Sequence, residues 1–271
     1  MKFLGFRRPD GEVGIRNHVL VLATVGCAAE AARQTADGIY GAVSFINQNG
    51  CGESSRNLRR TQDVLVGMAA NPNVYGVVAI GLGCEMNRMD GFIKELRART
   101  DKPIEGLLIQ EEGGTIETVA KAKKIARRMV IEASMCRREE CDISELMLGI
   151  ECGGSDATSG LVSNPVMGII SDRIIAAGCQ LIVFTTGRGN AIGSAVAPVM
   201  KVTANGDTAR KLSDNIDLDM SAVLEEGVSL DAMADITMQQ ILDTLSGRLT
   251  SAVTLKLGYS EAVISRACEY C

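Results

Sequence analysis

Short apolar runs alternate with amphipathic segments along most of the chain, beginning near residue 17. The run 18–25 (HVLVLATV) is almost wholly apolar, which is typical of a parallel strand covered on both faces. Further strands are predicted at 42–46, 74–83 and 103–110. The segments between and after them have helical periodicity and predict helices at 28–39, 54–70 and 87–99, and one that follows Gly113-Gly114 and ends near Cys136. Strand and helix therefore alternate, as in βαβ units.

The same pattern restarts after residue 143. Strand-to-glycine segments are expected at 145–156 and 181–190, a short strand at 199–203, and helices at 165–177 and 231–245. We therefore predict an α/β protein whose parallel sheets and crossover helices form two Rossmann-like or flavodoxin-like lobes. The predicted lobes are 1–142 and 143–271, with the charged stretch RREECD as their join.

Composition narrows the classes of function and location. The chain has 271 residues, 46% apolar and 23% charged, which is ordinary for a globular protein. A net charge of −5 with no basic block argues against nucleic acid as a partner. No apolar stretch approaches the roughly 18–20 residues that span a bilayer, and charges at Arg7, Arg8 and Asp10 interrupt any signal-peptide core. We expect a cytoplasmic protein with no membrane partner.

Four of the nine cysteines follow predicted strands and lie beside glycine. They are Cys27, Cys51, Cys84 and Cys152. Ligands bind beyond the carboxyl ends of parallel strands, and thiolates can bind a metal there. The alternative is that each cysteine only packs as a small apolar residue. For any single cysteine this packing role is favoured, whereas the occurrence of four such cysteines together favours a ligand site. The remaining cysteines are interpreted as packing or surface thiols: Cys136, Cys141, Cys179, Cys268 and Cys271.

Two further features could carry chemistry. His18 is the only histidine, so an imidazole base would have to be this residue. It begins its strand, at the edge opposite the usual ligand crevice, and a structural role is equally open. The loop 187–193 (GRGNAIG) could cradle a carboxylate, with Arg188 as a bidentate clamp. It matches no Walker or dinucleotide motif, so it is a weak signal alone.

Several stretches together carry a family resemblance. They occur in the order RRPDGEVGIRNHVLVLATVGCA, NGCGE, GLGCE, ECGGSDATSGLVSNPVMG and FTTGRGNAIGSAVAPVMKVTAN. The chain resembles the altronate and galactarate dehydratase family along nearly its whole length, and relatives of that family include the large subunit of sulfolactate sulfo-lyase. The resemblance implies a metal-dependent hydro-lyase that dehydrates a sugar acid to a 2-keto-3-deoxy acid.

The resemblance also implies site residues, cofactor and partners. Fe²⁺ is favoured as the metal, with Mn²⁺ or Mg²⁺ as alternatives, and a small SAF-type (antifreeze-like) subunit and a homo-oligomer are expected. The candidate residues fall into three groups: for the metal Cys51, Cys84 and Cys152; for catalysis His18, Glu85 and Asp156; for the substrate Ser155, Thr186, Arg188 and Asn190.

Two departures from the family pattern leave alternatives open. Many relatives have a histidine where this chain has Asn47. They also carry a long further segment between the helix at 165–177 and the strand at 181–190, which here are joined directly, so the chain is expected to be internally shortened. The alternatives are therefore a sulfolactate sulfo-lyase large subunit, which cleaves a carbon–sulfur bond, and a shortened non-catalytic paralogue that binds a sugar acid or a partner subunit.

Overall fold

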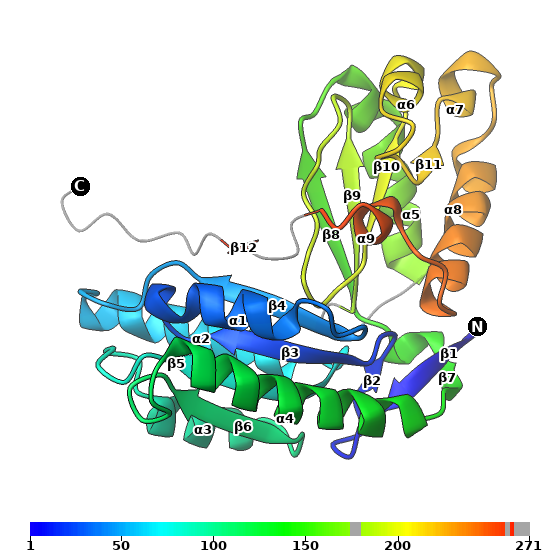
Figure 1. Ribbon diagram of the computed structural model, residues 1–271. Coiled ribbons are helices and arrows are strands. Elements are labelled where there is room, and N and C mark those ends of the chain that lie inside the picture. The colour runs from blue at the N-terminus through cyan, green and yellow to red at the C-terminus, as the bar shows by residue number, and fades with distance from the viewer. Residues whose placement is uncertain (174–179, 258–260, 263–271) are drawn as a thin grey trace. The chain divides into compact units, whose positions relative to one another are not determined.

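The computed structural model describes residues 1–173, 180–257 and 261–262 (Figure 1). By its contacts the chain divides into two units. The N-terminal unit comprises 8–137 with 259–271, and the C-terminal unit comprises 138–258 with 1–7. The predicted division at residue 142 stays a prediction. Each unit is described by itself below.

The N-terminal unit contains a five-stranded parallel sheet with the strand order β12-β4-β3-β5-β6. The strands are β3 (His18–Ala23), β4 (Ala42–Asn47), β5 (Val74–Gly81), β6 (Ile104–Leu108) and β12 (Glu261–Ala262), and a two-residue strand β2 (Val13–Gly14) precedes them. The central pair is β3 and β5, with Val21 opposite Val78 in register. Val21 and Val78 are fully buried because helices cover both faces of the sheet.

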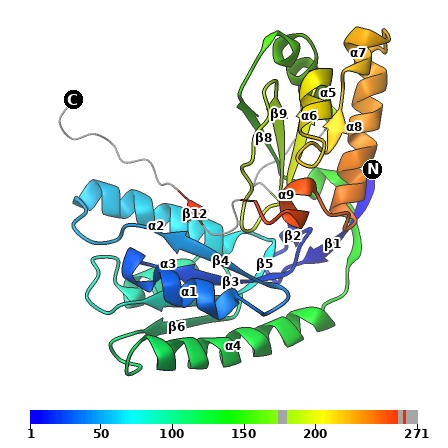
Figure 2. The ribbon, with the colours of Figure 1, turned by 45° about the horizontal axis from the view of Figure 1, so that its top comes forward.

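Helices α1 (Ala29–Ala36) and α4 (Thr115–Met135) cover one face of this sheet, and α2 (Ser55–Ala70) and α3 (Met89–Arg97) the other (Figure 2). A short 3₁₀ turn, η1 (Gly26–Ala28), precedes α1. Buried alanines of α1 and α4 pack on Val21, Val78 and Ile80, so small side chains let the helices approach the sheet closely. The hydroxyl of Ser54 caps α2 by accepting the backbone N–H of Asn57 at 3.5 Å.

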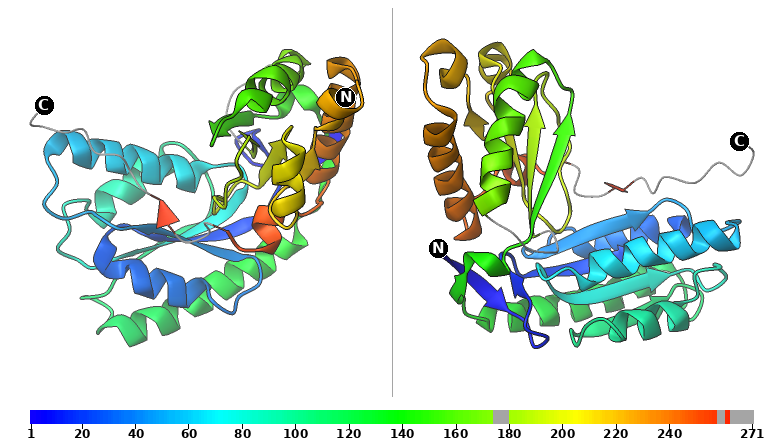
Figure 3. Two further views of the ribbon diagram at one scale, coloured as in Figure 1. Left: turned by 90° about the horizontal axis from the view of Figure 1, so that it is seen from above. Right: turned by 180° about the vertical axis from the view of Figure 1, so that it is seen from behind.

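The C-terminal unit contains a four-stranded parallel sheet with the order β11-β10-β9-β8. The strands are β8 (Leu148–Gly153), β9 (Leu181–Thr186), β10 (Val199–Thr203) and β11 (Leu218–Asp219). The helices are η2 (Ile143–Glu145), η3 (Ser159–Ser163), α5 (Asn164–Arg173), α6 (Gly206–Lys211), α7 (Ala222–Glu225), α8 (Leu230–Leu245) and α9 (Ser251–Thr254). Helix α5 packs beside α8, and α9 packs on β10 (Figure 3).

An antiparallel pair formed by β1 (Lys2–Arg7) and β7 (Glu139–Asp142) also belongs to the C-terminal unit. The sequence predicts only a charged join at β7. In the structure it pairs with β1, and the buried Cys141 lies opposite the buried Phe3. Exposed ion pairs flank this contact: Glu140 pairs with Lys2, and Arg7 pairs with Glu139 at 2.5 Å. Exposed pairs contribute at most about 1 kcal/mol each, so they supplement the buried contact rather than replace it.

The prediction of an α/β protein with parallel sheets is confirmed. The predicted strand 199–203 coincides with β10, and the predicted helix 231–245 differs from α8 by one residue. The end of the predicted helix 165–177 lies outside the described residues. In the part of the chain that the structure describes, no helix is long and apolar enough to cross a bilayer.

Candidate functional site

Three loops of the N-terminal unit meet where β3, β4 and β5 end. The N–H of Gly26, after β3, donates to the carbonyl of Asn49, after β4, at 2.7 Å. The N–H of Met86, after β5, donates to the carbonyl of Gly50 at 3.4 Å. A Cβ on Gly26 would lie 2.7 Å from the carbonyl oxygen of Gln48, so only glycine allows this approach. The three loops are therefore held to one another by backbone contacts.

Each of these loops carries one free, exposed cysteine: Cys27, Cys51 and Cys84. Slight desolvation raises the pKa of the exposed Cys51 thiol, and the groups Cys27, Cys84, Glu85 and Glu53 raise it further. Each of the three cysteines lies within two residues of a backbone hydrogen bond that joins two of these loops. The structure therefore brings the predicted ligands Cys51 and Cys84 to one edge of the sheet, with Cys27 beside them.

Glu85 directs its carboxylate into the loops. The side chain is 6% exposed. Oε1 accepts the Thr24 hydroxyl at 3.1 Å and the Leu82 N–H at 3.2 Å, and Oε2 accepts the Gly83 N–H at 2.6 Å. A Cβ on Gly81 would lie 2.1 Å from Oε1, so the carboxylate fills the space that this glycine leaves. These contacts make Glu85 a support of the β3 and β5 loops; its predicted catalytic role stays a prediction.

Asn47 ends β4 and is 1% exposed. Its Nδ2 donates to the carbonyl of Thr24 at 2.9 Å, and its Oδ1 accepts the N–H of Asn49 at 3.1 Å. The amide thus ties the β3 and β4 loops together. The departure from histidine noted in the sequence therefore has a structural role here.

His18 lies at the opposite edge of the same sheet. It begins β3, and its backbone N–H donates to the carbonyl of Asn73 at 2.9 Å. Burial, and then the charges of Arg16 and Arg8, lower the pKa of His18 to about 4. The strand separates it from Thr24 by about 20 Å, at about 3.3 Å per residue. The structure does not bring His18 together with the cysteines.

Asp156 organises the strand ends of the C-terminal unit. Its Oδ1 accepts the N–H and the hydroxyl of Thr158 at 2.9 and 2.6 Å and the N–H of Ser159 at 3.2 Å, and its Oδ2 accepts the Asn205 amide at 2.8 Å. Burial acts to raise the pKa of Asp156, but these hydrogen bonds outweigh it and lower the pKa. A Cβ on Gly187 would lie 2.2 Å from its Cγ. The ionised carboxylate therefore joins the loops after β8, β9 and β10.

The loop after β9 presents Arg188. The backbone N–H of Arg188 donates to the carbonyl of Gly154 at 2.9 Å, and the hydroxyl of Thr186 accepts the N–H of Gly189 at 3.0 Å. The Arg188 side chain is exposed and forms no ion pair with any described residue. Thr186 is fully buried and supports the loop from below. The backbone is thus fixed while the guanidinium remains available to an anion.

The other predicted residues of this unit differ in how they are placed. Ser155 is exposed, and its hydroxyl donates to the carbonyl of Gly153 at 3.3 Å. The side chain of Asn190 accepts the N–H of Ile192 and lies over Gly153. Cys152 belongs to β8, but its side chain lies outside the described residues, so its predicted metal role stays a prediction.

Sequence reasoning missed three residues that the structure places at or under these strand ends. Asn205 and Thr24 each directly support a strand-end carboxylate. Their position one or two residues after a strand is a signal that could have found them. Lys201 in β10 is fully buried, and its Nζ has no hydrogen-bond partner in the described part of the chain. Burial lowers the pKa of Lys201, with Asp217 acting in the opposite direction.

The donor types of the N-terminal unit suit a metal. Thiolates select iron, zinc and copper(I), and carboxylates accept harder ions. Among the described residues, however, no three histidine, cysteine or acidic side chains lie in an arrangement that could hold a single metal ion. The predicted ligands are thus of the right chemistry, whereas a closed single-ion site is not formed by the side chains that the structure describes.

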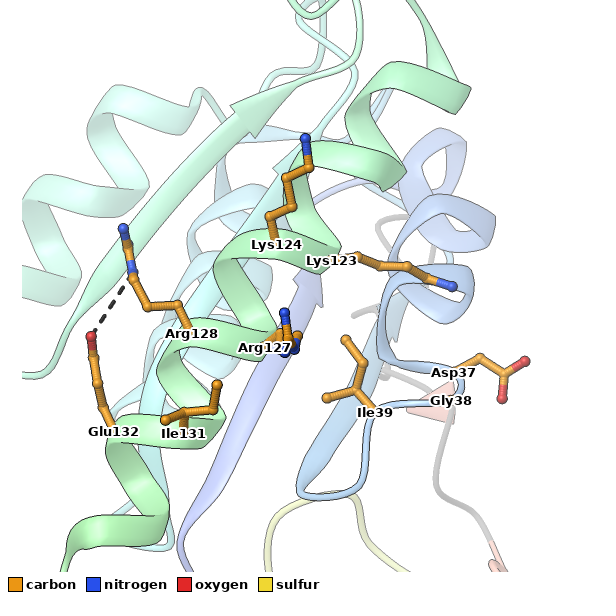
Figure 4. A pocket seen from close by; sticks show the side chains of 9 residues that line it. All are labelled: Asp37, Gly38, Ile39, Lys123, Lys124, Arg127, Arg128, Ile131 and Glu132. Atoms are coloured by element: carbon orange, nitrogen blue, oxygen red, sulfur yellow. Dashed lines mark ion pairs between the residues drawn. The ribbon is translucent and has the colours of Figure 1, made fainter.

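A surface groove of about 600 Å³ lies between the end of α1 and the outer face of α4 (Figure 4). Its lining is Asp37, Gly38, Ile39, Lys123, Lys124, Arg127, Arg128, Ile131 and Glu132. Helix α1 begins at the carboxyl end of β3 and ends before the amino end of β4, so Asp37 lies at the edge of the sheet that His18 shares. The groove is therefore separate from the cysteine loops.

Comparison with known families finds two matches. Residues 5–134 match the family model for D-galactarate dehydratase/altronate hydrolase, second domain. Residues 143–177 and 173–269 match that for D-galactarate/altronate dehydratase, C-terminal. The second model matches in two pieces whose ends meet at 173–177, next to the position at which the sequence predicts a missing segment.

Individual relatives are lyases. The chain is 28% identical to (2R)-sulfolactate sulfo-lyase subunit beta of Chromohalobacter salexigens over 98% of both chains. That alignment spans 386 positions, whereas this chain has 271 residues, so at least 115 positions are gaps in this chain. The chain is 34% identical to altronate dehydratase of Escherichia coli K12 and of Bacillus subtilis 168, over 64% and 65% of its length. These matches span only 36% and 37% of the two dehydratases.

Proposed function

Because the chain belongs to the D-galactarate dehydratase/altronate hydrolase family of lyases, we propose that it is a metal-dependent hydro-lyase that dehydrates a sugar acid to a 2-keto-3-deoxy acid. The observation that carries this proposal is that family models match both units, over 5–134 and 143–269. Both sets of strand-end loops, with their exposed thiols and guanidinium, lie in the matched regions.

The reaction is an elimination next to a carboxylate. A proton leaves the carbon α to the carboxylate, hydroxide leaves the β carbon, and the resulting enol tautomerises to the keto acid. Negative charge accumulates on the carboxylate as the C–H bond breaks, so a fixed cation there lowers the barrier. The guanidinium of Arg188 is suited to this role because its loop is fixed by the bonds to Gly154 and Thr186. Asn190 and Ser155 would add polar contacts.

The acidic residues divide between positioning and proton transfer. The lowered pKa of Asp156 makes it a weak base, so a positioning role suits it better than proton abstraction. Glu85 accepts three hydrogen bonds, which likewise suits a support. The proposal therefore needs another general base. One possibility is an acidic group whose hydrogen bonds are released when substrate binds. His18 could act as the base only if the substrate reached its edge of the sheet.

We propose iron as the metal, with Mn²⁺ and Mg²⁺ as alternatives, and the strand-end cysteines Cys51, Cys84 and Cys152 as its candidate holders. When bound, the metal would supply a Lewis acid for the developing charge or for the leaving hydroxide. Support comes from the donor chemistry of Cys51 and Cys84 at one sheet edge.

We also propose a cytoplasmic complex with a small SAF-type subunit and a homo-oligomeric state. A relative that aligns over 98% of both chains is by name a subunit beta, so that enzyme has at least one further subunit. The same relative favours a second candidate function, which is cleavage of the carbon–sulfur bond of sulfolactate. The gap of at least 115 aligned positions favours a third, in which the chain binds a sugar acid or a subunit without turnover.

One assay separates these functions. The protein is purified without oxygen, supplied with Fe²⁺, and incubated in parallel with altronate, galactarate and sulfolactate, with and without a small SAF-type subunit. A keto-deoxy acid from either sugar acid supports the hydro-lyase, and sulfite from sulfolactate supports the sulfo-lyase. Folded, iron-supplied protein that forms neither product, even with the subunit present, contradicts both lyase proposals.

A further inference from the structure

The groove between the end of α1 and the outer face of α4 has no part in the proposed function. Four cations of α4 line it: Lys123, Lys124, Arg127 and Arg128. We propose that this groove binds an acidic segment of a partner protein, whose two carboxylates and one apolar side chain lie along α4. The proposal concerns binding alone, so it does not rest on the proposed lyase activity.

The charges of the groove are not balanced within the described part of the chain. Arg128 pairs with Glu105 at 3.3 Å and with Glu132 at 3.9 Å (Figure 4). The other three cations form no ion pair with any residue that the structure describes. Asp37 and Glu132 are the acidic residues of the lining. Three of the four cations therefore remain available to an external anion.

The cations also repel one another along the helix. Lys123 and Arg127 are four residues apart on α4, so both lie on the same face of the helix, one turn apart. Like charges at this spacing destabilise a helix. By contrast Lys121, on the same helix but outside the groove, pairs with Glu112 at 2.6 Å. An anion in the groove would remove the repulsion, and the net charge of −5 shows that the basic character is local.

Apolar side chains complete the groove. Ile131 is 53% exposed, and Ile39 lies opposite α4, partly buried against the core of the N-terminal unit. Tyr40, which directly follows Ile39, is 99% exposed. Arginine and exposed aromatic residues are enriched where proteins bind one another. A partner that fits this groove therefore needs an apolar side chain in addition to its carboxylates.

The helix fixes the spacing that the partner must match. Lys123, Arg127 and Ile131 follow one another at intervals of four residues, which is about 6 Å along α4. In an extended segment, side chains on one face are two residues apart, which is about 6.6 Å. A segment of the form acidic–x–acidic–x–apolar therefore places one carboxylate at each cation and its apolar side chain at Ile131. Both chain directions satisfy this spacing.

The exposure of the groove favours a protein segment over a small molecule. Pockets for small ligands bury about 70–90% of the ligand's surface. Here every lining residue except Ile39 is exposed, so a small anion would stay largely in water. A segment of a folded partner can be held there because the rest of the partner adds contacts outside the groove. Such a partner would leave the cysteine loops accessible, since they lie at the other edge of the sheet.

The test is titration of the full chain with labelled peptides, followed by fluorescence anisotropy. The probes contain Glu-Ser-Glu-Ser-Leu or its reverse between glycines, at peptide concentrations up to about 1 mM. We expect at least one probe to bind, and to bind more weakly as salt rises from about 50 to about 500 mM. Replacing both glutamates of the probe by glutamine should weaken binding about tenfold, and so should the double variant Lys123→Glu/Arg127→Glu.

Lys121→Glu is the matched control. It reverses an exposed charge on the same helix outside the groove, so the affinity should stay within about twofold of the wild type. A probe with Lys-Ser-Lys-Ser-Leu should bind the double variant Lys123→Glu/Arg127→Glu and not the wild type. This rescue distinguishes recognition by charge from damage to the fold, which circular dichroism spectra of each variant also measure.

Each other outcome overturns the proposal. One is that neither acidic probe binds the wild type, and another is that the double variant binds as well as the wild type. Tighter binding of inorganic phosphate or of an oligonucleotide at the same cations would assign the groove to a different anion. Self-association that the double variant abolishes, without binding of either probe, would assign it to a second copy of this chain. All these measurements read binding, so loss of the lyase proposal would leave them unchanged.

Discussion

In both units a carboxylate lies at the carboxyl end of a parallel sheet and fills the space that a glycine leaves. Glu85 does so at Gly81 in the N-terminal unit, and Asp156 does so at Gly187 in the C-terminal unit, where an added Cβ would lie 2.1 and 2.2 Å from carboxylate atoms. Both accept hydrogen bonds from backbone N–H groups of their own loop. In both units, therefore, a carboxylate that accepts backbone hydrogen bonds holds the strand-end loops in place.

The side chains that remain exposed around the two carboxylates are different. The loops around Glu85 present three thiols, and the loops around Asp156 present the guanidinium of Arg188. The first set suits a soft metal, and the second suits a carboxylate. In each unit the acidic residue is the support, and we propose that the neighbouring exposed side chains carry the chemistry.

The largest effect that tests this comparison is expected for Glu85→Ala. The substitution leaves the backbone N–H groups of Leu82 and Gly83 without their acceptor, and each such loss costs about 1–3 kcal/mol when the group is buried. The Thr24 hydroxyl keeps a second acceptor, the Ile80 carbonyl at 3.3 Å. We expect the free energy of unfolding to fall by about 4 kcal/mol, measured by urea denaturation. Glu111→Ala is the control, because Glu111 is exposed at the end of β6, and its change should stay within about 0.5 kcal/mol. A loss of similar size in both variants would contradict a supporting role.

Glu85 also shows how far the sequence could predict the site. Apolar runs located the strands, and so the loops that carry Cys51, Cys84 and Arg188, because buried parallel strands have a distinctive composition. Spacing along the chain does not give the direction of a side chain, so the inward carboxylate of Glu85 could not be foreseen. Asn205 acts on Asp156 from 49 residues away, and such a contact depends on the strand order.

The same limit explains the β1 and β7 pair. Strand β7 is charged at three of its four positions, and its one buried residue, Cys141, lies opposite the buried Phe3 of β1. The fold class and the longer strands and helices of the two main sheets were predictable, since burial on both faces determines their composition. The short elements were not predicted: β11, β12, α6, α7 and α9. Elements and contacts that depend on a partner distant in sequence were not predictable either.

A second comparison sets the two edges of the N-terminal sheet against each other. The pKa of His18 is about 4 in the folded chain, against about 6.5 when exposed. The unfolded chain therefore binds more protons between these values, so stability is complete above pH 6.5 and falls as the pH drops towards 4. We expect a loss of up to about 3 kcal/mol from this group.

The measurement is the free energy of unfolding at pH 7 and pH 4 for the wild type and for His18→Gln. The variant should lose less stability than the wild type over this range, because glutamine does not titrate. Carboxylates titrate in both proteins and cancel in the difference. Equal losses in the two proteins would show that His18 is not held neutral by its surroundings, and would reopen a functional role at this edge.

Buried lysines provide a third comparison between the units. Lys102 of the N-terminal unit donates to the carbonyls of Ala70 and Asn71, both at 2.6 Å, whereas the Nζ of Lys201 has no partner among the described residues. Removing an uncompensated polar group from a core is favourable. We expect Lys201→Met to raise the free energy of unfolding by about 2 kcal/mol and Lys102→Met to lower it by about 1 kcal/mol.

The predicted difference in stability between Lys201→Met and the wild type also depends on pH, in a definite direction. Burial lowers the pKa of Lys201, so the unfolded chain binds the extra proton and the wild type gains stability as the pH rises towards the ordinary lysine value of about 10.4. The advantage of Lys201→Met should therefore shrink between pH 7 and pH 10. A destabilised Lys201→Met variant would indicate that Nζ has a partner that the described residues do not include.

The smallest expected change in free energy is for substitution of Arg188. It tests whether this side chain binds the substrate carboxylate or is only a surface residue. The side chain is exposed and forms no ion pair with the described residues, so Arg188→Ala should change the free energy of unfolding by less than about 0.5 kcal/mol. If it binds the substrate carboxylate, KM for the sugar acid should rise about tenfold, equivalent to about 1.4 kcal/mol.

Arg188→Lys separates charge from geometry at this position. Lysine keeps the charge but loses the bidentate fork, so a receptor for a planar carboxylate should recover only part of the affinity. Direct titration with the sugar acid gives the same comparison without turnover, and Arg210→Ala, which removes an exposed arginine that pairs with Asp207, is the control. Unchanged binding in Arg188→Ala would break the comparison between the units, because the loops around Asp156 would then present no anion receptor at Arg188.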